Sequence, residues 1–243
     1  MSLLYLGAVA LVSCLAGATA SIVGFGIGSL LTPLVAARFG TDVAIAAVAI
    51  PHLAGSLVRG WRLRRSIDRT VLVRFGVLSA VFGLVGALAF SRLAPMALTR
   101  TLGALLLLTA TAGITGWSTR WRPKGAIVWV LGALSGFFGG AVGNQGGLRA
   151  AALSSFGLAP VAFVATSTLI GVFVDLARTP VYLYRAGASL AGLWALVALA
   201  TAGVLAGTLI GERMLFGLSP ERFRVVISAA VGLLGLWFLF GPV

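Results

Sequence analysis

The composition of this 243-residue chain excludes a soluble globular domain, because 60% of its residues are hydrophobic and only 9% are charged. A soluble domain carries about 25% charged residues, and the mean hydropathy of +1.10 is typical of a protein embedded in a lipid bilayer. The net charge of +13 would indicate a nucleic-acid partner in a soluble protein. Here the basic residues lie at the ends of apolar runs, where they fix the orientation in the membrane, so we expect no nucleic-acid partner.

Long apolar runs predict about eight transmembrane helices, since a helix needs about 20 apolar residues to cross the hydrocarbon core. There are nine runs for about eight crossings. The run 28–37 is too short to cross the membrane alone, and it can continue the run 3–23 as part of one crossing. In chain order the runs cover 3–23, 28–37, 43–58, 71–90, 97–117, 125–142, 161–177, 188–211 and 223–240.

Two stretches of the chain resemble each other. A glycine cluster at 23–29 leads to Phe39-Gly40, and a second cluster at 142–148 leads to Phe156-Gly157. Paired glycine-interrupted segments in two halves of a membrane protein indicate a substrate site at the repeat interface. We therefore predict an all-α polytopic membrane protein with two repeated halves, 1–118 and 119–243, each containing a Gly-rich broken or re-entrant helix. The pattern leaves open whether the halves are inverted or parallel.

Other glycines have a packing explanation. Gly132, Gly136 and Gly140 are four residues apart, as are Gly203, Gly207 and Gly211. Such ladders of small residues let helix backbones approach closely in lipid. The segment 139–147 is different, because five glycines and two amides within nine residues weaken a helix interior. A break there frees backbone groups, which are tolerated at membrane depth only where they are buried in protein or line a wet cavity.

The duplicated arrangement resembles the TauE/SafE sulfite exporter family of bacterial membrane permeases. The resemblance covers both halves and matches the family in size and span number. It implies export or uptake of small anions such as sulfite and organosulfonates, coupled to protons or to the membrane potential. Asn144 and Gln145 depart from a pure glycine string, so the substrate can differ from sulfite. The residues that carry the resemblance are 21–28 with Pro33 in the first half, and 136–140, 143–147 and 165–168 in the second.

The chemistry of the broken helices agrees with an anion, because a helix start exposes N–H groups and a positive dipole end. Asn144 and Gln145 add amide donors, and Arg149 is a candidate counter-charge. The alternatives are helix–helix hydrogen bonding for the amides, an interfacial anchor for Arg149 and local capping for the hydroxyls. The predicted substrate-binding residues are Gly24, Gly26, Gly28, Ser29, Gly143, Asn144, Gln145, Gly146, Gly147, Arg149, Thr166 and Ser167.

Two ionisable residues inside apolar runs are candidates for proton coupling. Asp175 lies within an apolar run, where an acid is by default a functional hypothesis. It can also pair with Arg178, three residues further along the same helix face. His52 follows Pro51 near the middle of a run and has a side chain that titrates near neutral pH. Its alternative role is that of a packed, hydrogen-bonded residue.

The distribution of basic residues predicts the orientation. If the first two runs make one crossing, eleven basic residues fall on one side and seven on the other. The positive-inside rule then places both termini in the cytoplasm and the protein in the inner membrane. The more basic side comprises Arg59, Arg62, Arg64, Arg65, Arg69, Arg74, Arg120, Arg122, Lys124, Arg178 and Arg185.

The sequence argues against an enzyme. Five acids, one histidine and one cysteine yield neither a metal set nor a nucleophile–base pair with motif spacing. We therefore expect no cofactor and no metal, with a small anion and the lipid bilayer as partners and a homo-oligomer as an open option. The predicted function is a permease or exporter for a small, sulfur-containing anion, driven by a proton gradient or the membrane potential. The alternatives are a passive anion channel and a non-transporting membrane assembly subunit.

Overall fold

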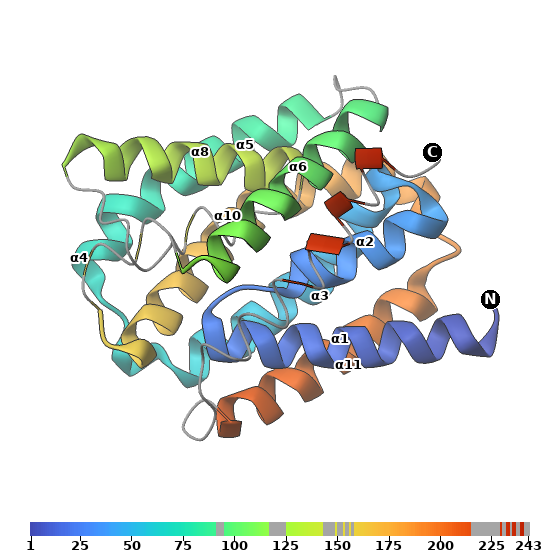
Figure 1. The fold of residues 1–243 in the computed structure, drawn as a ribbon, viewed down its shortest axis with the longest axis horizontal. Coiled ribbons are helices and arrows are strands. Elements are labelled where there is room, and N and C mark those ends of the chain that lie inside the picture. Colours follow the sequence, from blue (N-terminus) through green and yellow to red (C-terminus); the bar gives the residue numbers. More distant parts are fainter. Residues whose placement is uncertain are drawn as a thin grey trace.

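The computed structural model describes residues 1–90, 95–116, 125–142 and 158–214, together with isolated positions at 149, 153, 156 and in 229–240. Within these residues the fold is helical and contains no strand (Figure 1). The elements are α1 (Leu3–Val23), α2 (Ile27–Phe39), α3 (Thr41–Arg62), η1 (Arg64–Ser66), α4 (Arg69–Val71), η2 (Leu72–Gly76), α5 (Val77–Phe90), α6 (Pro95–Ile114), α8 (Ala126–Val142), α10 (Pro160–Leu190) and α11 (Trp194–Met214).

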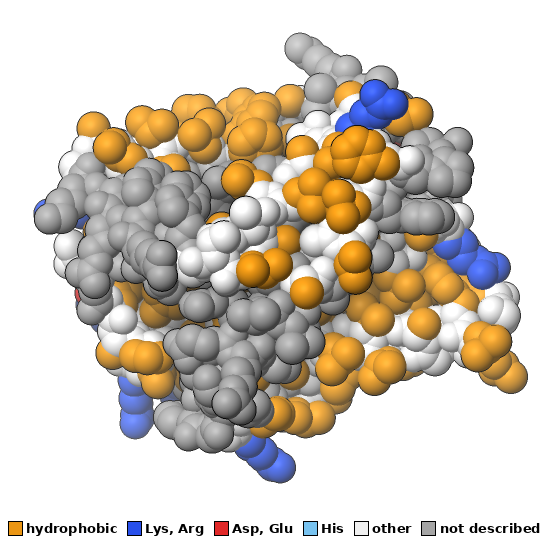
Figure 2. Space-filling model, viewed as in Figure 1, with side chains coloured by type: hydrophobic (Ala, Val, Ile, Leu, Met, Phe, Trp, Pro, Cys, Tyr) orange, Lys and Arg blue, Asp and Glu red, His pale blue; other side chains and the backbone are white. Residues whose placement is uncertain are grey.

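The structure is that of a polytopic membrane protein. In the described part of the chain, five helical segments are long and apolar enough to cross a bilayer. Hydrophobic side chains cover much of the face shown in Figure 2, and the Lys and Arg side chains lie toward its edges. The five segments are Leu3–Val23, Thr41–Arg62, Arg69–Ala89, Pro160–Leu190 and Trp194–Met214.

The first glycine cluster breaks the helix and reverses the chain. Gly24 and Gly26 have φ of 82° and 140°, a conformation that side chains with a Cβ rarely adopt. The break therefore falls between α1 and α2, in the cluster where the sequence predicted one. At the other end of α2, the rings of Phe39 and Tyr5 lie 6.1 Å apart, so α2 runs back along α1. The expectation that the run 28–37 continues the first run is wrong.

Two helix pairs pack backbone against backbone at glycines. A Cβ on Gly17 of α1 would overlap the backbone of Val204 in α11, and a Cβ on Gly207 would overlap the backbone of Cys14. In the same way, Gly136 of α8 lies against the backbone of Ser79 in α5. The pairs α1–α11 and α5–α8 are both parallel, because residues later in one helix contact residues later in the other. The packing role predicted for these glycine ladders is confirmed.

Helices α3 and α10 form an antiparallel pair in the interior. Arg59 of α3 is hydrogen-bonded to Thr168 of α10, and His52 to Asp175. Moving back seven residues in α3 thus corresponds to moving forward seven in α10. Helix α10 continues to Leu190, beyond the end of the expected run 161–177. Arg178, expected at a membrane surface, therefore lies inside the helix and is 1% exposed.

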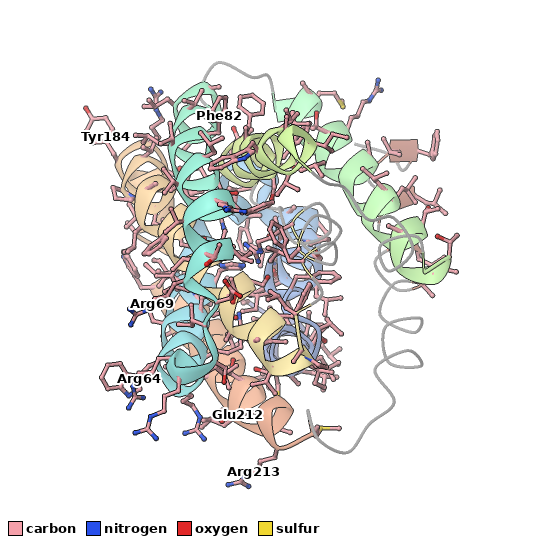
Figure 3. The ribbon with its side chains drawn as sticks, turned by 90° about the vertical axis from the view of Figure 1, so that its left-hand side faces the viewer. Arg64, Arg69, Phe82, Tyr184, Glu212 and Arg213 are labelled. Carbon is pink, nitrogen blue, oxygen red and sulfur yellow. The ribbon has the colours of Figure 1, made fainter. Side chains whose placement is uncertain are left out.

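The directions of α1, α2 and α3 bear on the predicted orientation in the membrane. Because α2 folds back, α3 starts at the end of the molecule that holds the N-terminus, and Arg62 lies at the opposite end (Figure 1). There Arg62 forms an ion pair with Glu212 of α11. Figure 3 shows Arg64 and Arg69 projecting outward from the helices. This basic segment and the N-terminus lie at opposite ends of the molecule, whereas the count of basic residues placed them on the same side of the membrane.

Candidate functional site

A stripe of polar side chains runs along the contact between α3 and α10. On α3 the stripe comprises His52, Ser56 and Arg59, which the spacing of four and three residues places on one helix face. All three are buried. On α10, Thr168 and Asp175 contact this face of α3. The buried polar residues of α10 are Thr166, Ser167, Thr168, Asp175, Arg178, Thr179 and Tyr182.

The stripe divides into two layers. The first joins Arg59 to Thr168 and the second joins His52 to Asp175. Seven residues separate the layers on each helix, which corresponds to about 10 Å along the axis. His52 lies at the middle of α3, whereas Arg59 lies less than one turn from its end. The first layer is therefore displaced from mid-depth toward the end of α3.

The first layer contains the predicted counter-charge beside the helix break. The Arg149 side chain donates from Nε to Ser167 Oγ at 2.9 Å and from Nη2 to the Gly24 carbonyl at 3.5 Å. Ser167 Oγ also donates to the Gly24 carbonyl at 3.3 Å. Arg149 is 2% exposed, and its Nη1 is buried and has no hydrogen-bond partner in the part of the chain that the structure describes. The structure thus joins Gly24, Arg149 and Ser167, three of the residues predicted from sequence.

Arg59 completes this layer from the opposite helix. Its Nε donates to Thr168 Oγ1 at 2.7 Å, and its Nη1 is buried without a hydrogen-bond partner among the residues that the structure describes. The side chain is 2% exposed. Arg59 and Arg149 are thus hydrogen-bonded to adjacent residues of α10, Thr168 and Ser167.

Thr166 has a different contact from the one predicted. Its Oγ1 accepts a hydrogen bond from the backbone N–H of Asp68 at 2.9 Å. Asp68 in turn caps α4, because its Oδ1 accepts from the Val71 N–H at 2.9 Å. Thr166 therefore ties the segment after α3 to the start of α10 rather than facing the helix break.

The second layer is a buried ion-pair network. Asp175 Oδ2 lies 2.6 Å from His52 Nδ1, and Asp175 Oδ1 lies 2.7 Å from Arg178 Nη2. Arg178 also donates to the Gly139 carbonyl, and the Tyr182 hydroxyl donates to the Gly140 carbonyl. The network joins α3, α10 and the end of α8. Asp175 and Arg178 pair as their spacing predicted, but within the helix core rather than at a surface.

The remaining predicted residues divide into two groups. Gly26, Gly28 and Ser29 lie at the break and in the first turn of α2, which has no side-chain cap. All three are buried. Gly143, Asn144, Gln145, Gly146 and Gly147 lie outside the described residues.

The sequence analysis missed Arg59 and Tyr182 as parts of the polar interior. Arg59 was counted with the basic segment that follows α3, because it lies next to Arg62, Arg64 and Arg65 in the sequence. Its spacing from His52 was the available signal, since residues seven apart lie on one helix face. Tyr182 stands seven residues after Asp175 and carries the same signal.

A helical membrane protein with a broken helix beside buried cationic side chains has the features of a transporter. Over residues 9–238 the chain matches the family model described as Sulfite exporter TauE/SafE, and it belongs to this family. No curated protein and no solved structure matches it. Membership implies a multi-pass membrane protein that exports sulfite or a related small anion, and its members are transporters rather than enzymes.

Proposed function

We propose that this protein carries a small, sulfur-containing oxyanion, such as sulfite or an organosulfonate, across the inner membrane. The observation that carries the proposal is the buried Arg149 side chain at the helix break, with a donor nitrogen that has no partner among the described residues. An uncompensated charge in the protein interior costs several kcal/mol. A bound anion offsets this cost, which accounts for an arginine at this position.

The surroundings of Arg149 suit an oxyanion. A guanidinium group offers parallel N–H donors that match two oxygens of one ligand. The first turn of α2 starts at the same break, and the N–H groups of a helix start attract anions. Gly24 and Gly26 permit the positive φ angles of the break, and the Gly24 carbonyl accepts hydrogen bonds from Arg149 and Ser167. Gly28, Ser29 and Ser167 border the same region, while Gly143, Asn144, Gln145, Gly146 and Gly147 remain a proposal from sequence.

We assign proton coupling to His52 and Asp175. They form the 2.6 Å contact in the second layer, about 10 Å from the first layer along the helices. A proton added to this pair weakens the hold of Asp175 on Arg178, which also binds the Gly139 carbonyl. Protonation of the pair thereby changes how firmly Arg178 holds the end of α8 through the Gly139 carbonyl. A gradient of protons would in this way favour one arrangement of the helices over another.

The two halves, 1–118 and 119–243, are proposed to be inverted repeats. Helices α1 and α8 each precede a glycine cluster, and α3 and α10 each follow one. The antiparallel packing of α3 and α10 supports the inverted arrangement. In transporters with such repeats, the site lies at the repeat interface, and one repeat rocks against the other. The first polar layer occupies this interface.

We propose an orientation with the N-terminus outside the cell. The basic segment after α3 contains Arg62, Arg64, Arg65 and Arg69, at the end of the molecule opposite the N-terminus. The positive-inside rule assigns such a segment to the cytoplasm. This replaces the sequence-based expectation for the N-terminus.

The test is transport of labelled sulfite, thiosulfate and a short organosulfonate into proteoliposomes, with and without an imposed proton gradient. We expect saturable flux that follows the gradient. Flux that does not saturate and is independent of the proton gradient would support the passive channel instead. An absence of flux for all three anions, in protein shown to be folded, would refute the proposed substrate class.

A further inference from the structure

We propose that Arg59 and Arg149 together form a twin-arginine site that selects doubly charged oxyanions over singly charged ones. This inference rests on the proposed function and narrows its substrate class. The ligand is a compact dianion with three or four oxygens, such as sulfite, thiosulfate or sulfate. Singly charged sulfonates are then poor ligands.

The two arginines are held in equivalent ways. Arg59 Nε is anchored by Thr168 Oγ1 at 2.7 Å, and Arg149 Nε by Ser167 Oγ at 2.9 Å. Because the anchoring residues are neighbours on α10, both guanidinium groups converge on the same turn of that helix. In the described part of the chain, each leaves its Nη1 buried and without a hydrogen-bond partner. In our proposal, these two donors bind one ligand.

The charges of the described interior do not cancel. Arg59, Arg149 and Arg178 are buried, and Asp175 is the one buried acid among the described residues. Asp175 is paired with Arg178, with His52 on its other oxygen. Among the described residues, the three buried arginines therefore exceed the one buried acid by two positive charges, which a dianion would neutralise.

The remaining acids are engaged elsewhere or lie far along the chain. Asp68 caps α4 through the Val71 N–H, and Glu212 pairs with Arg62. Asp42 lies in the first turn of α3, at the opposite end of that helix from Arg59. The fifth acid, Glu221, lies outside the described residues. None of the acids that the structure describes, other than Asp175, is placed to compensate the two arginines.

A glycine keeps the site free of a side chain. A Cβ on Gly171 would lie 3.2 Å from Arg149 Nη1, the same nitrogen that has no partner. Gly171 follows Thr168 by one turn of α10. A side chain at this position would press on the Arg149 guanidinium, so Gly171 leaves room for that group beside α10.

The first test is calorimetric titration of the purified full-length protein with thiosulfate, a dianion, and methanesulfonate, a monoanion. Because a hydrogen bond to a charged group contributes enough to change affinity by roughly 10- to 100-fold, we expect thiosulfate to bind at least about tenfold more tightly. Arg59→Gln should bring the two affinities close together. Arg59→Lys should weaken binding but keep the preference, and Arg65→Gln, which removes an exposed arginine, should behave as the wild type.

Two results would overturn the inference. Equal affinity of the wild type for both anions, with flux intact, would refute dianion selection while leaving the proposed function standing. An unchanged preference in Arg59→Gln would remove Arg59 from the site. Binding and transport of neither anion would remove the proposed function together with this inference.

The second test distinguishes a binding role from a structural one. If Arg59 carries an uncompensated charge, Arg59→Gln should raise the melting temperature of the anion-free protein and abolish the rise caused by thiosulfate. A structural arginine would give the reverse, a lower melting temperature without anion. That outcome would refute the twin-arginine site even if the variant still folds.

Discussion

At the residue scale, Asp175 has the most demanding position in the described interior. It is fully buried and lies within 3 Å of both His52 and Arg178. Breaking a buried ion pair leaves its partner uncompensated, which is more costly than replacing both members. The stability of the second layer therefore depends on this carboxylate.

Replacing Asp175 with Asn should lower the free energy of unfolding by about 3–5 kcal/mol, because Arg178 remains buried without its counter-charge. Thermal unfolding in detergent measures the change. Asp42→Asn, which alters a half-buried acid at the start of α3, is the control and should have a much smaller effect. Equal effects of the two variants would contradict the assigned network.

His52→Gln should preserve a hydrogen bond to Asp175 while removing the group that exchanges protons near neutral pH. We expect the variant to fold with near wild-type stability and to transport anion at a rate that no longer responds to the proton gradient. Flux with and without a gradient measures this. A variant that is still stimulated by the gradient would exclude His52 from coupling.

The sequence predicted the residues of the site unevenly. Arg149, Ser167 and Gly24 were found because each adjoins a glycine cluster or a hydroxyl run, and Asp175 and Arg178 because their spacing pairs them on a helix. Arg59 was missed because a run of arginines hides which member turns inward. Arg59 turns inward because this part of α3 packs against α10, where Thr168 accepts its hydrogen bond. Such a contact between distant segments is not visible in the local sequence.

At the scale of elements, the parallel pairs α1–α11 and α5–α8 depend on glycines that no other residue can replace. Gly17 and Gly7 both lie on α1 but differ in surroundings. A Cβ at Gly17 would overlap the Val204 backbone, whereas a Cβ at Gly7 would meet nothing within 4 Å.

Gly17→Ala should therefore destabilise the protein by about 1–3 kcal/mol through overpacking. Gly7→Ala should be neutral or stabilise it by up to about 1 kcal/mol, because alanine favours a helix interior over glycine. Comparing the two melting temperatures tests the packing. A loss of stability in both variants, or in neither, would contradict it.

Helix identities were largely predictable, but their directions were not. The apolar runs 3–23, 43–58 and 125–142 correspond closely to α1, α3 and α8, because bilayer thickness dictates their lengths. The reversal at Gly24 and Gly26 depends on two positive φ angles, and composition alone does not distinguish a reversal from a continuation. Helix α10 continues past Arg178, because Asp175 and the Gly139 carbonyl pair with this side chain inside the protein.

At the scale of the whole molecule, the reversal at the first glycine cluster decides the orientation. Three segments, α1, α2 and α3, separate the N-terminus from the basic segment after Arg62. The two ends of this stretch therefore lie at opposite ends of the molecule (Figure 1).

Cysteine labelling tests this orientation. In a Cys14→Ala background, Ser2→Cys should react with a membrane-impermeant maleimide in intact cells. Ser66→Cys, in the basic segment, should react only after the membrane is permeabilised. The reverse pattern would restore the orientation with a cytoplasmic N-terminus, and labelling of both residues from one side would contradict the reversal of α2.

The most direct test of the account is sulfite flux in proteoliposomes for Arg149→Gln beside Arg65→Gln. Both variants lose one arginine, but Arg149 is buried at the helix break and Arg65 is exposed. We predict that Arg149→Gln lowers flux at least about tenfold, by the worth of a charge-assisted hydrogen bond, while Arg65→Gln transports as the wild type. Equal flux in the two folded variants would contradict an anion site at the break between α1 and α2.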